Sequence, residues 1–389
     1  MRSQLRSVHI TDCALVTGLG IGVEQVWSEL LAGKTAIRPV EHFCTTNYVS
    51  QVAALVSGLT ATAGTSRLYP LLEQLLEQLD DVPGEARLIT ATTKGAIDLL
   101  EDHYHHDCQW DQPGNAKAVV PGAMTRWISK RLQLADGGMN INAACASSTL
   151  AIARGAALIA SGTVEVVVVC CADLVSEFVF SGFSALQALS AQASRPFDRA
   201  RSGLTLGEGA AAVVLMSDTA AKRYGRSKLA EVCGWGAAND ANHITAPARD
   251  GCGLIQTIHQ ALRNAQLTPD DVAAISAHGT GTVYNDMMEL TAFNAIFGER
   301  NVPLSSIKGA LGHTLGAAGG IEVVLGIASL NDQLVSPTCG LEHPEPLAQG
   351  QVSTIAQPFN GDGNGDVLLS TNSGFGGVNA ALVLRRGQR

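Results

Sequence analysis

Short apolar segments rich in β-branched residues alternate along the chain with longer segments rich in alanine and leucine. The apolar segments predict strands at residues 14–17, 87–91, 164–171, 211–216, 273–277, 366–370 and 380–385. Apolar residues at three-to-four spacing predict helices at residues 23–32, 68–81 and 323–330. Strands that alternate with helices are typical of α/β proteins, in which helices cover the faces of central sheets.

Two segments interrupt this alternation, and we interpret both as insertions. They are the amphipathic helix at residues 68–81 and the polar stretch at residues 101–115. No sequence repeat is visible, yet a strand that runs into a polar stretch of Gly, Ala, Ser and Thr occurs at residues 140–149 and again at 276–282. This parallel predicts two similar halves, residues 1–230 and residues 231–389.

Composition narrows the class of protein. Only 16% of the 389 residues are charged, against about 25% in average soluble chains, and strands buried on both faces explain the difference. The 26 Lys and Arg against 35 Asp and Glu give a net charge of −9, which argues against broad nucleic-acid binding. No apolar window is long enough for a membrane span, and the N-terminus does not read as a signal peptide. Nine irregularly spaced cysteines without a CxxC pair favour a reducing cytoplasm.

Cys145 stands where a short strand-like segment meets an alanine-rich helical segment. The N-terminus of a helix carries a partial positive charge, which lowers the pKa of a nearby thiol and favours the nucleophilic thiolate. Cys145 is therefore a candidate nucleophile. A small apolar cysteine on a buried helix explains the same pattern equally well.

His278 follows a predicted strand in the sequence HGTGT, and the hydroxyls of Thr280 and Thr282 can bind a polar chain beside it. A core or capping histidine in a tight turn is the plainer interpretation. Lys308 and His313 lie in a glycine-rich stretch, which is also typical of a packing loop. The order GxxxxGK[ST] is absent there, which excludes a P-loop.

Two further segments invite a functional interpretation. Phe375 lies between glycines, where it can act as a gate or pocket wall, although an ordinary glycine turn accounts for it too. His103, His105 and His106, followed by Asp107 and Cys108, imitate a metal cluster. They lack helical i,i+4 spacing and a matching distant pair, so we predict a solvated loop and no metal site.

Six motifs occur in one order along the chain. They are NAACASS around Cys145, RPFDRARSGLTLGEGA at 195–210, DANHITAP at 240–247, HGTGTVYND at 278–286, KGALGHTLGAAG at 308–319 and NSGFGG at 372–377. Together with the N-terminal LVTGLG, they resemble the elongating β-ketoacyl-acyl-carrier-protein synthases of the thiolase superfamily. The resemblance covers nearly the whole chain.

This resemblance implies an α/β thiolase-like fold, with two similar halves stacked in five α-β-α-β-α layers. The first half would carry the nucleophile, and the second half the two catalytic histidines. The implied catalytic residues are Cys145, His278, His313 and Lys308, with Asp286 and Glu322 as supporting partners of the lysine.

The resemblance also implies a substrate-binding set. Thr280 and Thr282 match the threonines that bind the pantetheine arm, and Phe375 with Gly374 matches the gate. The backbone N–H groups of Phe375 and Cys145 would form an oxyanion hole. His243 and Thr245 fall in the family's loop beside the pocket mouth.

The implied reaction begins with transfer of an acyl group from a carrier protein to Cys145. Malonyl-carrier protein then loses carbon dioxide while His278 and His313 donate hydrogen bonds to the thioester oxygen, and the carbanion attacks the acyl carbonyl. No metal or redox cofactor is expected, because the phosphopantetheine arm arrives on the acyl carrier protein. The resemblance further implies a homodimer, or a heterodimer with a related subunit, formed through residues 138–142.

Departures and alternatives complete the prediction. The family's NSFGFGG reads NSGFGG here, one Phe shorter, and we hypothesise a polyketide or aryl-polyene type of chain elongation over ordinary fatty-acid synthesis. The alternatives are a non-condensing chain-length-factor-like partner or malonyl decarboxylase subunit, and a coenzyme A-dependent thiolase. Because carrier proteins of this family are typically acidic, we expect them to dock on a basic patch of Arg126, Lys130 and Arg131.

Overall fold

The computed structural model describes residues 5–61, 64–106, 117–359 and 365–387. Its main sheet consists of two sets of five strands. The first set, in spatial order, is β6 (Met139–Ile141), β5 (Arg87–Ala91), β7 (Val166–Asp173), β8 (Gly209–Ser217) and β1 (Val8–Thr17). The second set is β9 (Ala230–Asn239), β15 (Val378–Arg386), β14 (Val367–Gly374), β10 (Ala274–Ser276) and β11 (Leu304–Ser305).

The two sets are joined at one corner only. There β1 pairs with β9 through His9–Glu231 and Ile10–Ala230, and beyond these two pairs the sets separate into different layers. β2 (Gly20–Ile21) pairs with β1, and two short ribbons lie apart from the main sheet. The ribbons are β3 (Ile37–Pro39) with β4 (Val52–Ala54), and β12 (Leu334–Val335) with β13 (Gln357–Pro358).

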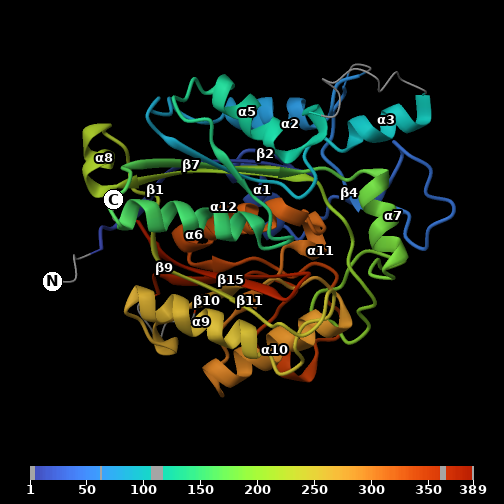
Figure 1. Cartoon of the computed structure of the whole chain (residues 1–389). Helices are drawn as coiled ribbons and strands as arrows, with labels where there is room; N and C mark the ends of the chain where they lie inside the picture. The colour runs from blue at the N-terminus through green and yellow to red at the C-terminus, as the bar shows by residue number, and fades with distance from the viewer. Residues whose placement is uncertain (1–4, 62–63, 107–116, 360–364, 388–389) are drawn as a thin grey trace.

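Helices form the other three layers, as Figure 1 shows. The outer layer over the first set contains α2 (Leu68–Leu76) and α5 (Pro121–Arg131), and the outer layer over the second contains α9 (Cys252–Ala265) and α10 (Val283–Phe297). Between the sets lie α6 (Ser147–Ala160) and α12 (Ala318–Asp332). Other helices within the described residues are α1 (Val23–Leu31), α3 (Asp98–His106), α7 (Glu177–Ala185), α8 (Asp218–Arg223) and α11 (Lys308–Leu311), with 3₁₀ turns at Pro269–Asp271, Leu315–Ala317 and Pro346–Ala348. The expected α-β-α-β-α order is confirmed.

The central helices are buried on nearly all sides, which explains why their sequences are apolar and small rather than amphipathic. Glycine lets them approach closely. A Cβ at Gly319 of α12 would lie 1.9 Å from the Thr149 hydroxyl of α6, and one at Gly320 would lie 2.3 Å from the Cys171 sulfur of β7. Close packing here fixes the start of α6, where Cys145 lies.

One expected insertion is instead part of the core. The leucines of α2, among them Leu68, Leu71, Leu72 and Leu75, are fully buried and pack against β1 and β8. Its amphipathic pattern therefore covers one face of the first sheet, so the interpretation as an insertion was wrong. The division of the chain at residue 230 stays a prediction; β9 begins there, shortly after α8.

The histidine cluster also differs from the prediction. His103 and His105 lie on α3 rather than in a loop, and the His105 ring lies 2.7 Å from the Glu177 carboxylate. Asp107 and Cys108 lie outside the described residues. This helix packs against α7, where the Phe178 N–H donates to the Glu101 carboxylate at 2.7 Å, a contact that periodicity alone does not show.

Two further predictions from the sequence concern membrane-spanning segments and the cysteines. Within the described parts of the chain, no helix is both long and apolar enough to cross a membrane. All eight cysteines that the structure describes are free, and Cys145, Cys170 and Cys171 are buried.

Candidate active site

Cys145 lies in a tight turn between β6 and α6. Ala144 has a φ of 49°, a left-handed conformation that is uncommon for a residue with a side chain. The Ser147 hydroxyl holds this turn, because it accepts from the Ala143 N–H at 2.9 Å and donates to the Ala144 carbonyl at 2.5 Å. Strain of this kind is typical of functional sites. Here it presents the Cys145 side chain at the start of the helix.

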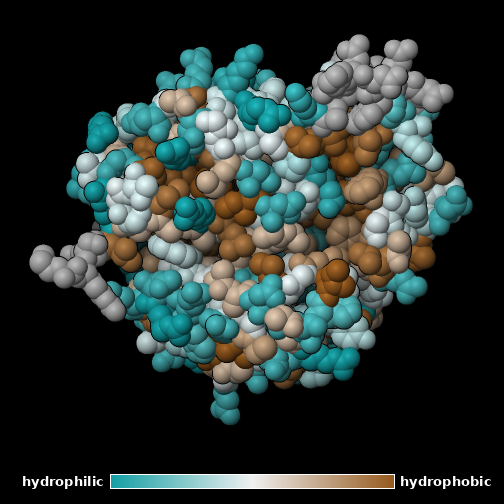
Figure 2. Space-filling model, viewed as in Figure 1, coloured by the Kyte–Doolittle hydropathy of each residue, from teal (hydrophilic) through white to brown (hydrophobic). Residues whose placement is uncertain are grey.

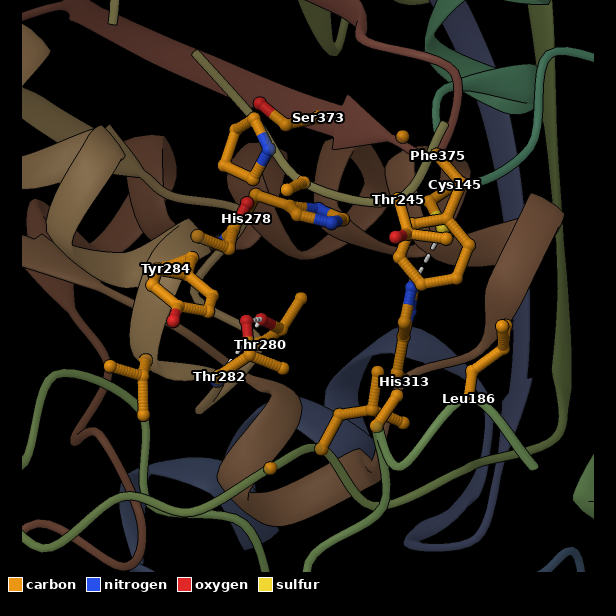
Figure 3. Close-up of a pocket in the computed structure, with 18 of the residues that line it drawn as sticks. Cys145, Leu186, Thr245, His278, Thr280, Thr282, Tyr284, His313, Ser373 and Phe375 are labelled. Atoms are coloured by element: carbon orange, nitrogen blue, oxygen red, sulfur yellow. Dashed lines mark hydrogen bonds between the residues drawn. The ribbon is translucent and has the colours of Figure 1, made fainter. Parts of the chain in front are cut away.

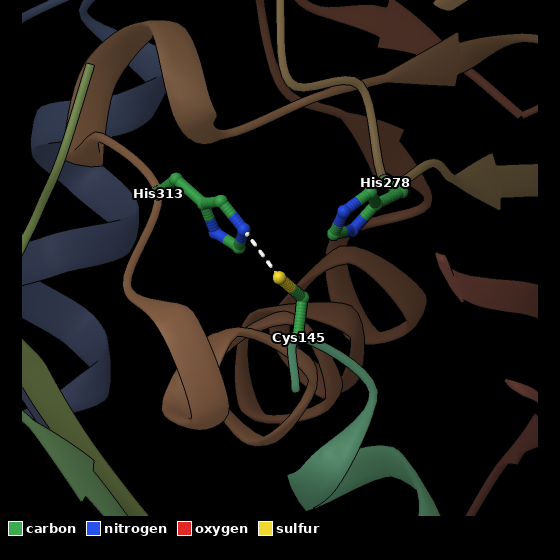
Figure 4. Close-up of side chains that lie close together, drawn as sticks. All are labelled: Cys145, His278 and His313. Carbon is green, nitrogen blue, oxygen red and sulfur yellow. Dashed lines mark hydrogen bonds between the residues drawn. The ribbon is translucent and has the colours of Figure 1, made fainter. Parts of the chain in front are cut away.

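The two predicted histidines lie on either side of this sulfur (Figure 4). His313 Nε2 lies 2.9 Å from Cys145 Sγ. The ring of His278 is nearly perpendicular to that of His313, with centroids 5.2 Å apart. All three residues are buried. His278 and His313 lie 133 and 168 positions after Cys145 in the sequence, in the loops after β10 and α11, and the fold brings all three together.

Burial decides the protonation state of this group. Burial raises the pKa of the Cys145 thiol to about 11, although the charge of Lys308 and a hydrogen bond from the Phe375 N–H act in the opposite direction. Burial and then the charge of Lys308 lower the pKa values of His278 and His313 well below the usual range. At neutral pH the site therefore holds a thiol and two neutral imidazoles. The thiol pKa is thus raised, contrary to the expectation of a lowered one, because desolvation outweighs the charge of Lys308 and the Phe375 hydrogen bond.

Asn372, at the end of β14, is a functional candidate that the sequence analysis missed. Its side-chain amide donates to His278 Nδ1 at 3.1 Å and to Glu322 at 2.7 Å, while its carbonyl oxygen accepts from the Thr149 hydroxyl. An amide nitrogen only donates, so Nδ1 is an acceptor and the proton of neutral His278 is on Nε2. In the sequence, the only signal for this role was a single asparagine at the end of a buried apolar strand.

Lys308 lies behind His278 rather than against the sulfur. Its buried ammonium group donates to the His278 carbonyl and to the Glu322 carboxylate, each at 2.5 Å. Glu322 is thus the expected partner of the lysine. Burial raises the pKa of Glu322, and the charge of Lys308 lowers it again. The lysine positions the loop that carries His278.

Asp286 does not contact Lys308, so its expected role as a partner of the lysine was wrong. It accepts from the backbone N–H of Phe197 at 2.8 Å and from that of Gly281 at 3.2 Å. Glu289, which the sequence analysis missed, accepts from the N–H groups of His278 and Gly279 at 2.7 and 2.6 Å. Two buried carboxylates thus fix the backbone of the HGTGT loop.

A cavity of about 390 Å³ leads from the surface to Cys145 (Figure 3). Thr280 and Thr282 line it, with their hydroxyls 2.9 Å apart. Thr245 also lines it, as expected. His243 does not; its exposed ring accepts from the backbone N–H groups of Thr245 and Ala246 and so holds that loop.

Phe375 and Gly374 line the same cavity next to Cys145. The Phe375 ring stacks on Phe183 of α7, with centroids 5.6 Å apart. A Cβ at Gly374 would lie 3.2 Å from the backbone nitrogen of Cys145, so a side chain there would crowd the turn of the nucleophile. The shortened NSGFGG loop therefore still brings an aromatic ring and a backbone N–H to the sulfur.

A second cavity, of about 420 Å³, begins on the other side of Cys145. Phe183, Leu186 and Phe375 line both cavities, so these side chains separate them at the sulfur. Its other walls come from α7, from the turn after β5 and from Leu315. The geometry suits a reaction in which a long chain extends from Cys145 into one cavity while a second reactant enters by the other.

Cys145, His278 and His313 also form the sole group of ligand atoms close enough for a metal ion among the described residues. Their atoms lie within 4.8 Å of one another. A metal would need the thiolate, whereas the raised thiol pKa and the Cys145–His313 hydrogen bond favour acid–base and nucleophilic chemistry.

The raised thiol pKa predicts a steep pH dependence for modification of Cys145. Because the thiolate reacts, the rate of alkylation by iodoacetamide should rise about tenfold for each pH unit from 7 to 10 without a plateau. Mass spectrometry of the Cys145 peptide measures this rate. Exposed Cys44 is the internal control, since a hydrogen bond with Thr46 lowers its pKa and its rate should level off earlier. A plateau for Cys145 near pH 7 would contradict the assignment of a resting thiol.

Comparison with known proteins gives this geometry a family. A family model described as the β-ketoacyl synthase N-terminal domain matches residues 88–221, and the C-terminal model matches residues 229–342. Over 413 residues the chain is 31% identical to 3-oxoacyl-[acyl-carrier-protein] synthase 2 of Vibrio cholerae serotype O1, covering 98% of this chain and 99% of that protein. It is also 31% identical to the tetracenomycin polyketide synthase ketoacyl synthase alpha subunit of Streptomyces glaucescens, covering 97% and 98% of the two chains.

The same family appears among solved structures. The ishigamide ketosynthase/chain length factor superimposes with a TM-score of 0.89 at 27% identity, covering 98% of this chain and 99% of that one. This likeness confirms the expected thiolase-like fold. The chain belongs to the β-ketoacyl synthase family of condensing enzymes.

Proposed function

We propose that the protein is a 3-oxoacyl-[acyl-carrier-protein] synthase that condenses malonyl-carrier protein with an acyl group held on Cys145. The observation that carries this proposal is the position of the Cys145 sulfur, 2.9 Å from His313 Nε2, at the meeting point of two cavities. One cavity is lined by paired threonine hydroxyls and reaches the surface. The other is mainly apolar and suits an acyl chain.

Acyl transfer starts from the neutral pair of thiol and imidazole. Because the thiol pKa is about 11, the sulfur needs a base as it attacks the thioester, and His313 Nε2 is the base within reach. The proton passes to His313 and then to the leaving thiol of the carrier arm. The product is an acyl thioester on Cys145 with both histidines neutral again.

Decarboxylation of the malonyl group develops negative charge on its thioester oxygen. His278 faces this position with a proton on Nε2, because Asn372 occupies its Nδ1. A fixed donor in a buried site stabilises the forming enolate strongly, since it does not have to reorient. The carbanion then attacks the acyl carbonyl, and the N–H groups of Phe375 and Cys145 stabilise the tetrahedral oxyanion.

The remaining residues position these groups. Lys308 holds the His278 carbonyl, and Glu322 links the lysine to Asn372. Thr280 and Thr282 bind the pantetheine arm, and Thr245 lines the same cavity. The phosphopantetheine arm belongs to the acyl carrier protein, so the enzyme needs no cofactor of its own in this proposal. We place the protein in the cytoplasm by analogy with its bacterial 3-oxoacyl-[acyl-carrier-protein] synthase relatives.

A second copy, or a related chain-length-factor-like subunit, would pair at β6, the strand at the outer edge of the first set. Met139 on this strand is 46% exposed, and Phe178 and Leu186, which line the second cavity together with Asn142 just after β6, are exposed as well. Figure 2 shows hydrophobic residues gathered on the viewed face over α3 and α7. An unpaired strand edge with exposed apolar side chains is typical of a surface that becomes covered. The relatives of fatty-acid and polyketide type are equally similar, so both kinds of chain elongation stay within the proposal.

Replacement of the nucleophile tests the proposal directly. Wild-type protein incubated with acyl-carrier protein should gain the mass of the acyl group on the Cys145 peptide. Cys145→Ala should abolish this adduct and lower condensation by about a thousandfold or more, while malonyl decarboxylation persists. Mass spectrometry and product analysis measure the two activities. Condensation that survives in Cys145→Ala would disprove the nucleophile, and decarboxylation without any wild-type adduct would favour a non-condensing subunit.

The role of Asn372 predicts a separation of the two half-reactions. In Asn372→Asp a carboxylate accepts from His278, which moves the imidazole proton to Nδ1 and removes the Nε2 donor. Condensation should fall about a hundredfold, whereas formation of the acyl adduct on Cys145 should change far less. Asn264→Asp on α9 is the control, since its amide donates to the Trp235 carbonyl far from the sulfur. Equal loss of both half-reactions would contradict this role.

Docking of an acidic carrier protein is tested at the basic patch of Arg126, Lys130 and Arg131. All three are exposed on α5, and Arg131 pairs with Glu73 at 2.9 Å. Reversal of the three charges to Glu should weaken carrier-protein binding about tenfold at low salt. Surface plasmon resonance measures this, with Lys222→Glu and Arg223→Glu on α8 as the control. Unchanged affinity of the triple variant would remove the patch from the proposal.

A further inference from the structure

The acyl cavity contains one charged side chain among the described residues that line it, that of Lys94. The apolar part of the wall comes from Phe178, Val179, Phe183, Leu186, Leu315 and Phe375. Thr93, Asn142 and Ser181 supply the polar groups, and none of them is acidic. A straight saturated chain would need no cation in this wall. The lysine therefore requires an explanation.

Lys94 is half-buried, and within the described chain its ammonium group forms no hydrogen bond or ion pair. The other buried cation of the site, Lys308, is satisfied by a carboxylate and a carbonyl. Lys94, by contrast, is among the residues that line the cavity beside the nucleophile, and it has no such partner in the part of the chain that the structure describes.

The backbone under Lys94 is rigidly held. Buried Asp173 accepts from the Thr92 hydroxyl at 2.7 Å, from the Thr93 N–H at 3.1 Å and from the Thr93 hydroxyl at 2.9 Å. The same carboxylate accepts from the Gly316 N–H at 2.7 Å, which ties this turn to the loop that follows His313. Gly95, with a φ of 62°, completes the turn. The backbone position from which the Lys94 side chain extends at the cavity wall is thus fixed.

We propose that Lys94 is a specificity-determining residue that selects acyl groups with a hydrogen-bond-accepting oxygen, a carboxylate or a ketone, on the chain beyond the thioester. Such an oxygen gives the ammonium group a charge-assisted hydrogen bond in a cavity whose other walls are mainly apolar. A plain alkyl group of the same size fills the cavity but leaves the cation unpaired. A single cation in a mainly apolar wall thus selects for an oxygen atom on the acyl chain.

This inference rests on the proposed function, since it concerns the acyl group that Cys145 carries. It also distinguishes two sources of the acceptor oxygen. If a carboxylate is the natural group, selection should weaken with added salt; if a neutral ketone is the natural group, it should not. Carbonyl oxygens spaced along a chain are the product of repeated condensation, so a ketone would mean that the enzyme elongates its own type of product.

The experiment uses three thioesters of nearly equal size: adipoyl, 6-oxoheptanoyl and 6-methylheptanoyl pantetheine, with shorter and longer homologues of each. Pairs compete for the intact wild-type enzyme, and mass spectrometry gives the ratio of adducts on Cys145 at early times. At least one oxygen-bearing group should be preferred over the branched alkyl group by about tenfold or more. Lys94→Met should remove this preference, and Lys94→Arg should retain it.

Lys222→Met on α8, where the exposed lysine pairs with Asp218, is the control for loss of a surface cation. It should keep the wild-type ratio. Equal adduct formation from all three thioesters in wild type would overturn the inference, as would an unchanged ratio in Lys94→Met. Absence of any adduct in wild type would instead overturn the proposed function. If Lys94→Met does not fold, the wild-type ratio together with Lys94→Arg still decides the question.

Discussion

The buried ion pair between Lys308 and Glu322 is the interaction on which the rest of the site depends. Removing two charges from water costs several kcal/mol for each ion, and this cost is offset only when every remaining donor and acceptor finds a partner. Here the lysine also donates to the His278 carbonyl, and Glu322 also accepts from Asn372. The ion pair therefore joins α11, α12, the end of β14 and the loop after β10 into one network.

That network helps to explain the protonation state of Cys145, His278 and His313. Burial, and after it the positive charge of Lys308, lowers the pKa of both imidazoles and so opposes their protonation. Burial thus favours the thiol over a thiolate–imidazolium pair, and the proton of Cys145 leaves as a thioester is attacked. A neutral resting site of this kind protects the sulfur from other electrophiles. Charge then separates only during attack on the thioester, a step in which the oxyanion hole and the histidines stabilise the charges that form.

Packing of the two halves supplies the space for two reactants. The central helices approach through glycine, and the loops they carry meet at Cys145 with one cavity on either side. Phe375 lies between the cavities and contacts α7 through Phe183. The low overall charge of the chain follows from this architecture, since both strand sets and the two central helices are enclosed. Among the described residues, buried Lys308, Glu322 and Asp286 have specific partners, whereas half-buried Lys94 forms no hydrogen bond or ion pair.

The sequence by itself determined the α/β class, most of the strands, and the candidacy of Cys145, His278 and His313, because period-two and period-3.6 patterns and ordered motifs are local properties of a chain. It misjudged α2, whose leucines are fully buried only because the first sheet lies beneath them. It could not find Asn372 or Glu289, whose importance comes from hydrogen bonds to residues distant in the sequence. It assigned Asp286 to the wrong partner for the same reason. The tertiary structure alone decided the protonation of the site, since a pKa depends on burial and on neighbouring charges that only the folded chain brings together.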